Sequence, residues 1–159
     1  MEVERPSVAD LDALADLWVD LADGQRSFGS HLRADANRDA VRESLSRRIV
    51  AGGCLVARDP EPIGFVTFYP ESETYDRDRS RGIVENLYVI PERRGEGVGT
   101  ALLRAAESAL ADGGADVVAL EVLAGNERAR EFYAARGYDA HRVELERPTE
   151  RETDTSEGG

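Results

Sequence analysis

Apolar residues recur along the chain at two spacings, which predict different secondary structures. A spacing of three to four residues follows a pattern resembling a capping box, Ser7 with Asp10, and predicts an amphipathic helix. The same spacing returns in two later runs, and a fourth helix is expected from Asn126 through Arg136. The first helix is expected to bury Leu11, Leu14, Leu17, Trp18 and Leu21, and the four helices to end at Gly24, Gly52, Gly113 and Gly137.

Alternating or continuous apolar runs, bounded by glycine, proline and charged residues, predict the strands. Asp59 and Pro60 join two of these strands in a hairpin, and the later strands alternate with helices. This order predicts a mixed α/β sheet. The expected strands cover residues 1–6, 54–59, 62–71, 83–90, 116–123 and 138–146.

The length of 159 residues suits one domain with one hydrophobic core. No apolar run reaches the roughly 20 residues of a membrane span, and the N-terminal residues lack the basic and apolar segments of a signal peptide. We therefore expect a cytoplasmic protein with no membrane partner. The single cysteine, Cys54, excludes an internal disulfide, and with two histidines far apart in the sequence no metal site is expected.

The side chains give the protein a strongly acidic charge. There are 32 acidic and 20 basic residues, a formal net charge of −12, and every basic residue is arginine. An acidic surface stays hydrated at high salt, where a Debye length of about 3 Å screens self-repulsion. The composition therefore predicts a halophilic protein, although a GC-rich genome would also favour arginine codons. No basic patch stands out, which argues against a nucleic-acid partner.

A glycine-rich turn between a strand and a helix is the clearest chemical feature of the sequence. In the stretch VIPERRGEGVGTALL, Gly95, Gly97 and Gly99 allow close approach to the backbone. Arg93 and Arg94 add positive charge. A helix N-terminus exposes unpaired N–H groups and the positive end of a dipole, so the turn predicts an anion site. A turn without a ligand is the alternative.

Two common phosphate motifs do not fit this turn. A P-loop requires a lysine, which the chain lacks, and a dinucleotide fingerprint requires a glycine where Thr100 stands. The stretch instead resembles the acetyl-CoA-binding motif of the GNAT superfamily of N-acetyltransferases, Arg/Gln-x-x-Gly-x-Gly/Ala, in which Arg94, Gly97 and Gly99 take the defined places. The later stretch LEVLAGNERAREFYAARGY resembles the second signature of that family. Its matching residues are Asn126, Ala129, Phe132, Tyr133, Gly137 and Tyr138.

The resemblance implies the GNAT fold, an α/β (α+β) domain. It implies a mixed central sheet of about six to seven strands flanked by about four helices. The N-acetyltransferase domain would cover residues 1–147, and residues 148–159 would form an acidic, disordered tail. The resemblance also implies a small-molecule or peptide amine as the acceptor and allows a homodimer, a common state in the family.

The resemblance further implies acetyl-CoA as the co-substrate. Its pantetheine arm would lie along the strand at 83–90 and pair with the backbone of Leu87 and Val89. Asn126 would bond this arm, although an asparagine at that place also suits a helix N-cap. The diphosphate would bind the amides of residues 94–99. The implied cofactor-binding residues are Leu87, Tyr88, Val89, Arg94, Gly95, Glu96, Gly97, Val98, Gly99, Thr100, Asn126 and Tyr133.

Direct transfer of an acetyl group to an amine needs a base, an oxyanion donor and an acid, and the resemblance suggests candidates for each. Glu85 and Glu121 are rival bases, and an ion pair with an arginine is the alternative role for either. A backbone N–H near Val89 would stabilise the oxyanion. Tyr133 is the candidate acid for the departing sulfur, with a core aromatic residue as the alternative. Strand alternation predicts that Glu85, Leu87 and Val89 share one face of the sheet.

Two other residues with reactive side chains are given structural roles. Cys54 precedes an apolar strand and is expected to be a small core residue rather than a nucleophile. His31 lies in the loop between the first two helices, where a surface position is favoured over a place in the acceptor pocket. The expected function is acetyl-CoA-dependent N-acetylation of a primary amine. A non-catalytic CoA-binding domain and the transfer of a longer acyl chain remain alternatives.

Overall fold

The computed structural model describes residues 1–72 and 75–151. The chain divides into two compact units, Met1–Asn126 and Glu127–Gly159. Within the described residues, the first unit contains a β-sheet and three α-helices, and the second contains one α-helix. Each helix in these ranges is too short or too polar to span a bilayer.

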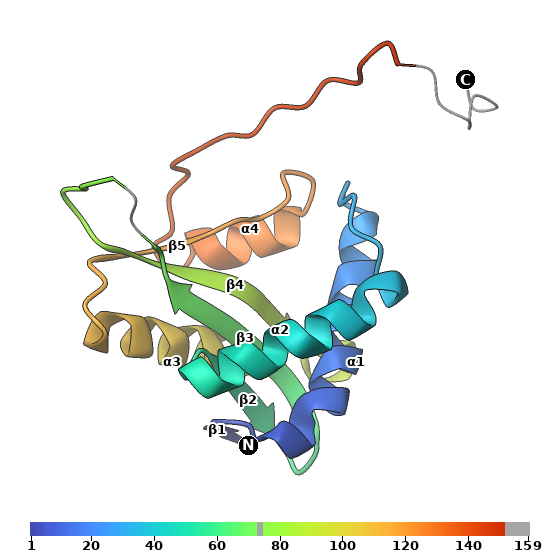
Figure 1. The fold of residues 1–159 in the computed structure, drawn as a ribbon, viewed down its shortest axis with the longest axis vertical. Coiled ribbons are helices and arrows are strands. Elements are labelled where there is room, and N and C mark those ends of the chain that lie inside the picture. Colours follow the sequence, from blue (N-terminus) through green and yellow to red (C-terminus); the bar gives the residue numbers. More distant parts are fainter. Residues whose placement is uncertain (73–74, 152–159) are drawn as a thin grey trace. The chain divides into compact units, whose positions relative to one another are not determined.

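The first unit is built on a sheet with the strand order β1-β2-β3-β4-β5 (Figure 1). Strands β1 to β4 pair antiparallel, and β5 pairs parallel to β4. The predicted mixed α/β sheet, with its hairpin of β2 and β3, is therefore confirmed. The strands are β1 (Glu2–Glu4), β2 (Cys54–Arg58), β3 (Pro62–Pro70), β4 (Arg81–Val89) and β5 (Val117–Leu120).

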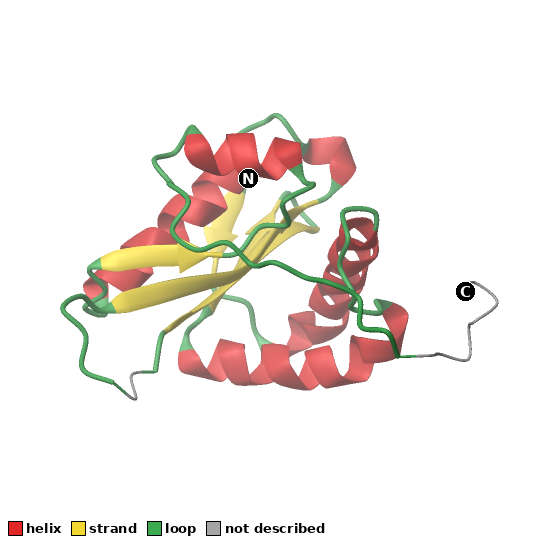
Figure 2. Cartoon of the chain, turned by 90° about the horizontal axis from the view of Figure 1, so that it is seen from above, coloured by secondary structure: helices red, strands yellow, loops and turns green. Residues whose placement is uncertain are grey.

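Three helices cover the two faces of this sheet (Figure 2). The capping box predicted at the first helix is present: the Asp10 carboxylate accepts from the Ser7 N–H at 2.8 Å, and the Ser7 hydroxyl accepts from the Ala9 N–H at 3.3 Å. The first helix runs two residues past its predicted end, because Gly24 lacks the positive φ with which Gly52 ends the second. The helices are α1 (Leu11–Arg26), α2 (Arg38–Ala51) and α3 (Val98–Asp112), with short 3₁₀ helices at Val8–Asp10, Asp35–Asn37 and Pro91–Arg93.

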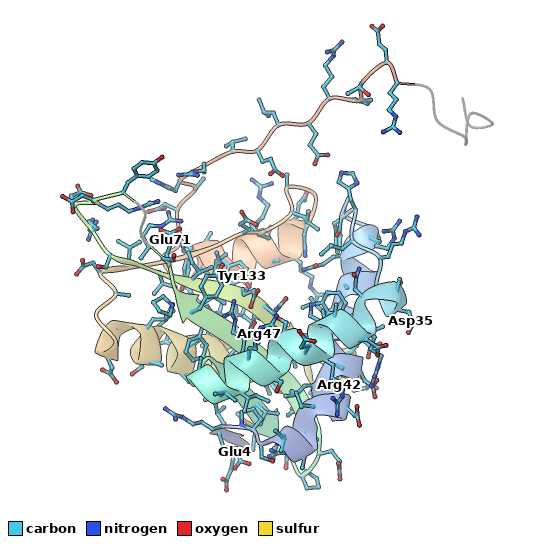
Figure 3. All side chains as sticks on the ribbon, in the orientation of Figure 1. Glu4, Asp35, Arg42, Arg47, Glu71 and Tyr133 are labelled. Carbon is cyan, nitrogen blue, oxygen red and sulfur yellow. The ribbon has the colours of Figure 1, made fainter. Side chains whose placement is uncertain are left out.

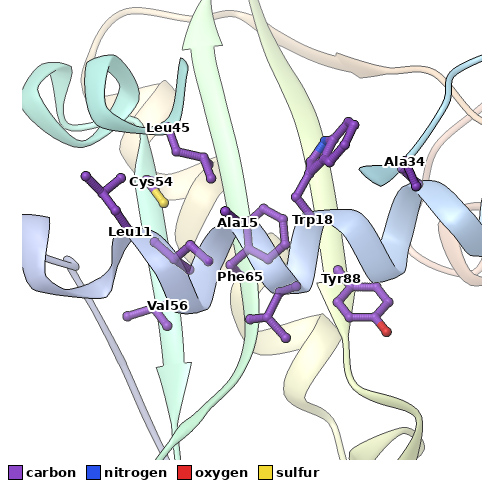
Figure 4. Close-up of a cluster of buried hydrophobic side chains, with 12 residues drawn as sticks. Leu11, Ala15, Trp18, Ala34, Leu45, Cys54, Val56, Phe65 and Tyr88 are labelled. Carbon is purple, nitrogen blue, oxygen red and sulfur yellow. The ribbon is translucent and has the colours of Figure 1, made fainter. Parts of the chain in front are cut away.

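The face of the sheet under α1 and α2 holds the main hydrophobic core (Figure 4). Apolar residues of α1 and Leu45 of α2 pack there against Phe65 of β3 and Tyr88 of β4. Each large apolar side chain contributes roughly 2 kcal/mol on burial. The cluster consists of Leu11, Leu14, Ala15, Leu17, Trp18, Ala22, Ala34, Leu45, Cys54, Val56, Phe65 and Tyr88.

Helix α3 packs on the opposite face, where two glycines let it approach the strands closely. A Cβ atom on Gly64 of β3 would lie 2.6 Å from the Tyr88 carbonyl oxygen and 3.2 Å from Leu102 of α3. A Cβ atom on Gly82 of β4 would lie 2.7 Å from Leu110. Because real Cβ atoms rarely come this close to neighbours, these two positions require glycine. The helix is thereby held against β3 and β4, the two strands that also carry the candidate active site.

The second unit contains α4 (Glu127–Ala134), and the strand predicted at 138–146 is absent from it. The fold therefore has five strands within the described residues, and the expectation of about six to seven was wrong. The alternating residues Val143 and Leu145 are 77% and 88% exposed. An alternating pattern forms a strand only where a neighbour accepts its hydrogen bonds and covers its apolar side. Within the described residues, no strand of the sheet pairs with this segment, and the apolar side chains of Val143 and Leu145 stay exposed.

Candidate active site

Strands β4 and β5 separate partway along the sheet. Their parallel pairing ends at the pair Val84 and Leu120, although β4 continues for five more residues to Val89. The strand predicted at 116–123 accordingly stops at Leu120. Residues 85–89 therefore present one edge that no described strand covers. An extended ligand with amide groups can pair with such an edge as an added strand does.

A bulge in β4 lies at the point where the two strands separate. Thr67 of β3 pairs with Asn86, but the next residue, Phe68, pairs with Val84. Glu85 is therefore the extra residue of the bulge. A bulge bends its strand and strengthens the local twist, which turns β4 away from its neighbour.

The backbone of β4 beyond the bulge faces the open edge at two residues. The Ile90 N–H donates to the Ile63 carbonyl at 2.9 Å, so the backbone N–H of Ile90 points toward β3. Because antiparallel strands alternate in this direction, the backbone groups of Leu87 and Val89 point the other way. These are the residues predicted to pair with the pantetheine arm. The side chain of Tyr88, between them, is buried in the core under α1.

The glycine turn links this open edge to α3. Gly95 and Gly97 have φ angles of 81° and 88°, a left-handed conformation that favours glycine. A Cβ atom on either would meet nothing within 4 Å, so the backbone angle and not crowding requires glycine. Gly97 is the N-cap of α3 and offers no side-chain cap, and the first helical hydrogen bond runs from the Ala101 N–H to its carbonyl at 3.0 Å. The first amides of α3 therefore need partners from outside the helix.

The two arginines of the turn have different surroundings. Arg93 donates to Asp59 at 2.7 Å and to Glu96 at 2.9 Å, so its charge is neutralised within the protein. Arg94 donates its Nε–H to the Val89 carbonyl at 2.9 Å, and no carboxylate of the described residues pairs with it. Of the two, Arg94 is therefore the one whose charge is available to an anion. This agrees with the sequence motif, in which Arg94 takes the defined place.

Glu85 belongs to a hydrogen-bonded network on the α1/α2 face. The buried Thr67 hydroxyl donates to Glu85 Oε1 at 3.2 Å and accepts from the Asn86 side-chain amide at 2.9 Å. Arg48 of α2 donates its Nε–H to the same Oε1 at 3.1 Å. The Arg48 guanidinium carbon lies 4.2 Å from the centre of the Tyr69 ring. The carboxylate is 36% exposed, so it is held in place and still open to solvent.

The prediction that Glu85 shares a face with Leu87 and Val89 was wrong. Thr67 bonds both Glu85 and Asn86, so two consecutive residues lie on its side of the sheet. The reason is the bulge, which interrupts strand alternation at Glu85. The carboxylate therefore faces α2, where Arg48 meets it.

Glu121 lies one residue beyond the end of β5 and is exposed. The β4–β5 register pairs Val84 with Leu120, and its next step would set Glu121 beside Glu85. Both candidate bases therefore lie where the strands part. Glu121 makes no hydrogen bond or ion pair with the residues that the structure describes. Glu85 accepts hydrogen bonds from Arg48 and Thr67, and the role of either glutamate as a base stays a prediction.

Tyr133 lies in α4, in the second unit. Its ring contacts the neighbouring Phe132 and Tyr138 edge-on, with ring centres 5.2 and 5.7 Å apart. Burial raises the pKa of Tyr133 to about 12, so its hydroxyl stays protonated at neutral pH. Asn126 immediately precedes α4, where an N-cap residue stands. The expected roles of Tyr133 and Asn126 toward acetyl-CoA remain predictions.

The remaining reactive side chains support structural roles. Cys54 is buried in the core, and desolvation raises the pKa of its thiol to about 12, so a nucleophilic thiolate is disfavoured. His31 is exposed in the loop between α1 and α2. In the described residues, no group of three or more potential ligands is arranged to hold a metal ion.

Sequence reasoning missed Arg48 and Thr67. Arg48 meets Glu85 only through the packing of α2 on the sheet, and nothing in the local sequence marks it. Thr67 did carry a signal: it is the one polar side chain in the apolar run from Ile63 to Phe68. A lone hydroxyl in a buried strand requires a hydrogen-bond partner, and the partners here are at the bulge.

Comparisons with known sequences agree with this geometry. The sequence profile of the Acetyltransferase (GNAT) family matches residues 14–138. An uncharacterized N-acetyltransferase of Archaeoglobus fulgidus is 31% identical over 136 residues, covering 85% of this chain and 90% of that protein. The thialysine N-epsilon-acetyltransferase of Bos taurus is 32% identical over 94 residues, covering 53% of this chain and 54% of that protein.

Solved structures share the fold at lower sequence identity. A mutant of the BH1408 protein from Bacillus halodurans superposes with a TM-score of 0.81 at 20% identity, covering 94% of this chain and 99% of that one. An aminoglycoside N-acetyltransferase in complex with CoA superposes with a TM-score of 0.70 at 18% identity, covering 92% and 93%. At these identities the likeness establishes the architecture only.

Proposed function

The chain belongs to the GNAT acetyltransferase family, and from this we propose that it transfers the acetyl group of acetyl-CoA directly to a primary amine. The observation that carries the proposal is the continuity of residues 85–100. This one segment supplies an uncovered strand edge, then Arg94, then the uncapped N-terminus of α3. A ligand with an amide-containing arm and a diphosphate matches that order.

The chemistry requires the amine to lose a proton before it attacks. The nitrogen forms a bond to the thioester carbonyl carbon, the carbon–sulfur bond breaks, and the sulfur takes a proton. The products are an N-acetylated amine and CoA, with one proton released. The Val89 N–H, which points to the open edge, is the proposed donor to the developing oxyanion.

Glu85 is our preferred base. It lies beside the open edge, and both hydrogen bonds that it receives end on Oε1, which leaves Oε2 to take a proton from the amine or from an intervening water. Glu121 is the second candidate, since the strand register leads to the same place. Tyr133 is the proposed acid, and with a pKa of about 12 its hydroxyl is protonated at neutral pH.

Turnover of acetyl-CoA against a panel of amines tests this proposal. The panel contains amino acids, polyamines, aminoglycosides and peptides with free N-termini, and the readout is release of the CoA thiol in concentrated KCl. We expect at least one class of amine to increase the release. If calorimetry detects acetyl-CoA binding while no amine accelerates release, the chain is a non-catalytic CoA-binding domain. Propionyl-CoA and succinyl-CoA, offered in place of acetyl-CoA, test for a longer acyl group.

A further inference from the structure

Glu85 has one carboxylate oxygen that accepts no hydrogen bond from the described residues, and it lies beside Arg48, most of whose guanidinium N–H groups are likewise unbonded there. The hydrogen bonds to Glu85, from the Thr67 hydroxyl at 3.2 Å and from Arg48 Nε at 3.1 Å, both end on Oε1. Within the described residues, no group donates to Oε2, and the Arg48 side chain donates no other hydrogen bond. Because a guanidinium carries five N–H donors, four remain for a ligand or water.

The Arg48 side chain is held from three sides. Its Cδ lies 3.6 Å from where a Cβ atom would stand on the buried Gly53, its guanidinium covers the Tyr69 ring, and its Nε–H is bonded to Glu85. The side chain is only 27% exposed. Ordering a long side chain normally opposes binding through lost rotamer freedom. The contacts within the fold already restrict the Arg48 rotamer, so little further conformational entropy is lost on binding and the guanidinium is preorganised for an anion.

We propose that the amine acceptor is a free α-amino acid or a zwitterion like it. Its ammonium would lie on Glu85 Oε2 and its carboxylate would accept two N–H groups from Arg48. The two charges of an α-amino acid are separated by a single carbon, and the two protein charges are likewise adjacent. A carboxylate and a guanidinium form bidentate hydrogen bonds, which provide orientation as well as affinity. This inference rests on the proposed function and specifies its acceptor.

The same pair of charges disfavours other amines. A polyamine or aminoglycoside would place positive charge against Arg48, and like charges held close together reduce affinity. A peptide N-terminus offers an amine with no carboxylate next to it. The net charge of −12 repels anions in general, so a carboxylate reaches this region only if a local cation holds it.

With an α-amino acid as the acceptor, the reaction is the same acetyl transfer from acetyl-CoA to an amine. The α-ammonium gives one proton to Glu85 and forms a nitrogen–carbon bond to the acetyl carbonyl, while the carbon–sulfur bond breaks. The nitrogen loses its second proton to solvent, and the thiolate is protonated. The carboxylate stays on Arg48 unchanged. The products are an N-acetylamino acid and CoA.

The test compares each of the twenty L-amino acids with its carboxamide, in which the carboxylate charge is absent and the amine is kept. CoA release is measured for the wild type, Arg48→Met and the control Arg47→Met. Arg47 (Figure 3) is the preceding residue on α2. Its side chain is 67% exposed and pairs with Glu43. In the wild type we expect at least one amino acid to exceed its carboxamide in kcat/KM by about tenfold or more.

Arg48→Met is expected to raise the KM of that amino acid and to remove its advantage over the carboxamide, whereas Arg47→Met keeps it. The wild-type comparison needs no variant, so a poorly folded Arg48→Met leaves the test intact. The inference is overturned if the carboxamides have the same kcat/KM as their amino acids in the wild type, or if Arg48→Met lowers kcat/KM equally for both. The proposed acetyltransferase activity is unaffected by either result. If no amine of any class is acetylated, the proposed function itself fails.

Discussion

The proposed chemistry of this protein involves a few residues around the β4 bulge. Glu85 is the bulged residue, Thr67 lies opposite it, and Arg48 reaches it from α2. Each position alone is ordinary: a strand glutamate, a buried threonine and a helix arginine. Their combination keeps one carboxylate ordered and partly solvated at the edge where an acyl donor is proposed to bind.

Conservative replacement of the three proposed catalytic side chains separates their roles. We expect Glu85→Gln to lower kcat by about a hundredfold, because an amide cannot take the proton of the amine. Glu121→Gln is the matched control from the same end of the sheet and is expected to change kcat only slightly. Tyr133→Phe is expected to lower kcat because it removes the proton donor. Acetyl-CoA affinity, measured by calorimetry, should stay constant in all three, and the reverse ranking of the two glutamates would make Glu121 the base.

Thr67 is proposed as a positioning residue for Glu85. Thr67→Val keeps the shape but leaves the Asn86 amide without its acceptor, which is expected to lower the free energy of unfolding by about 1 to 2 kcal/mol. We also expect kcat to fall about tenfold with little change in the KM for acetyl-CoA, because a misplaced base affects chemistry more than donor binding. Thr67→Ser retains the hydroxyl and should restore kcat. If Thr67→Ser is as slow as Thr67→Val, the hydroxyl does not position the base.

At the scale of elements, the strand β4, the glycine turn and α3 form one continuous functional unit. The strand provides the open edge, the turn reverses the chain with two left-handed glycines, and the helix begins without a cap. Close packing of α3 on Gly64 and Gly82 fixes the helix relative to the strand. The proposed anion site is therefore positioned by the sheet as well as by the turn.

Two glycine-to-alanine variants are expected to change stability in opposite directions. Gly97→Ala forces a side chain into a φ of 88° and should lower the free energy of unfolding by about 1 to 2 kcal/mol. Gly24→Ala lies inside α1, has no positive φ, and meets nothing within 4 Å. It should raise stability by roughly 0.5 to 1 kcal/mol. Urea denaturation measures both, and a stabilising Gly97→Ala would contradict the geometry of the turn.

The two arginines of the turn should differ in function. Arg94→Gln removes the charge that no described carboxylate neutralises, so we expect acetyl-CoA affinity to fall about tenfold with little loss of stability. Arg93→Gln breaks the contacts to Asp59 and Glu96 and should leave affinity nearly unchanged. Calorimetric titration with acetyl-CoA measures both constants. Equal losses in the two variants would show that general positive charge, and not the Arg94 position, binds the ligand.

At the scale of the whole molecule, acidic charge dominates the surface. The net charge is −12. Arginines of α2, such as Arg42 (Figure 3), pair with aspartates of α1, and Arg42 lies 2.8 Å from Asp12. Such exposed pairs contribute little to stability, because water and salt screen them. Repulsion among the excess carboxylates is therefore the larger salt-dependent effect.

We expect the melting temperature to rise from dilute buffer to multimolar KCl, because salt screens that repulsion. Scanning calorimetry across a KCl series measures the change. Sucrose at matched osmolality is the control, since it acts by exclusion from the surface without screening charge. An unchanged melting temperature in KCl would contradict the proposed adaptation to salt.

The local pattern of the chain predicted the presence of the four α-helices among the described residues, the hairpin and the glycine turn. Capping, apolar spacing and left-handed glycines act over a few residues, so the roles of Ser7, Leu14 and Gly97 follow from their neighbours in the sequence. The family signature at Arg94 is likewise a run of adjacent residues. The strand predicted at 138–146 is absent, because a strand needs a neighbouring strand to pair with and the local sequence pattern does not reveal that partner.

The surroundings of Glu85 became visible only in three dimensions. Its face of the sheet depends on where β3 and β4 slip by one residue, and its partner Arg48 is 37 residues away in sequence. Strand register and helix packing arise from the summed fit of many distant side chains, which no short stretch encodes. Local sequence thus determined the glycine turn and the start of α3, and the tertiary arrangement decided that Glu85 lies at the open edge of β4 and that Arg48 holds it.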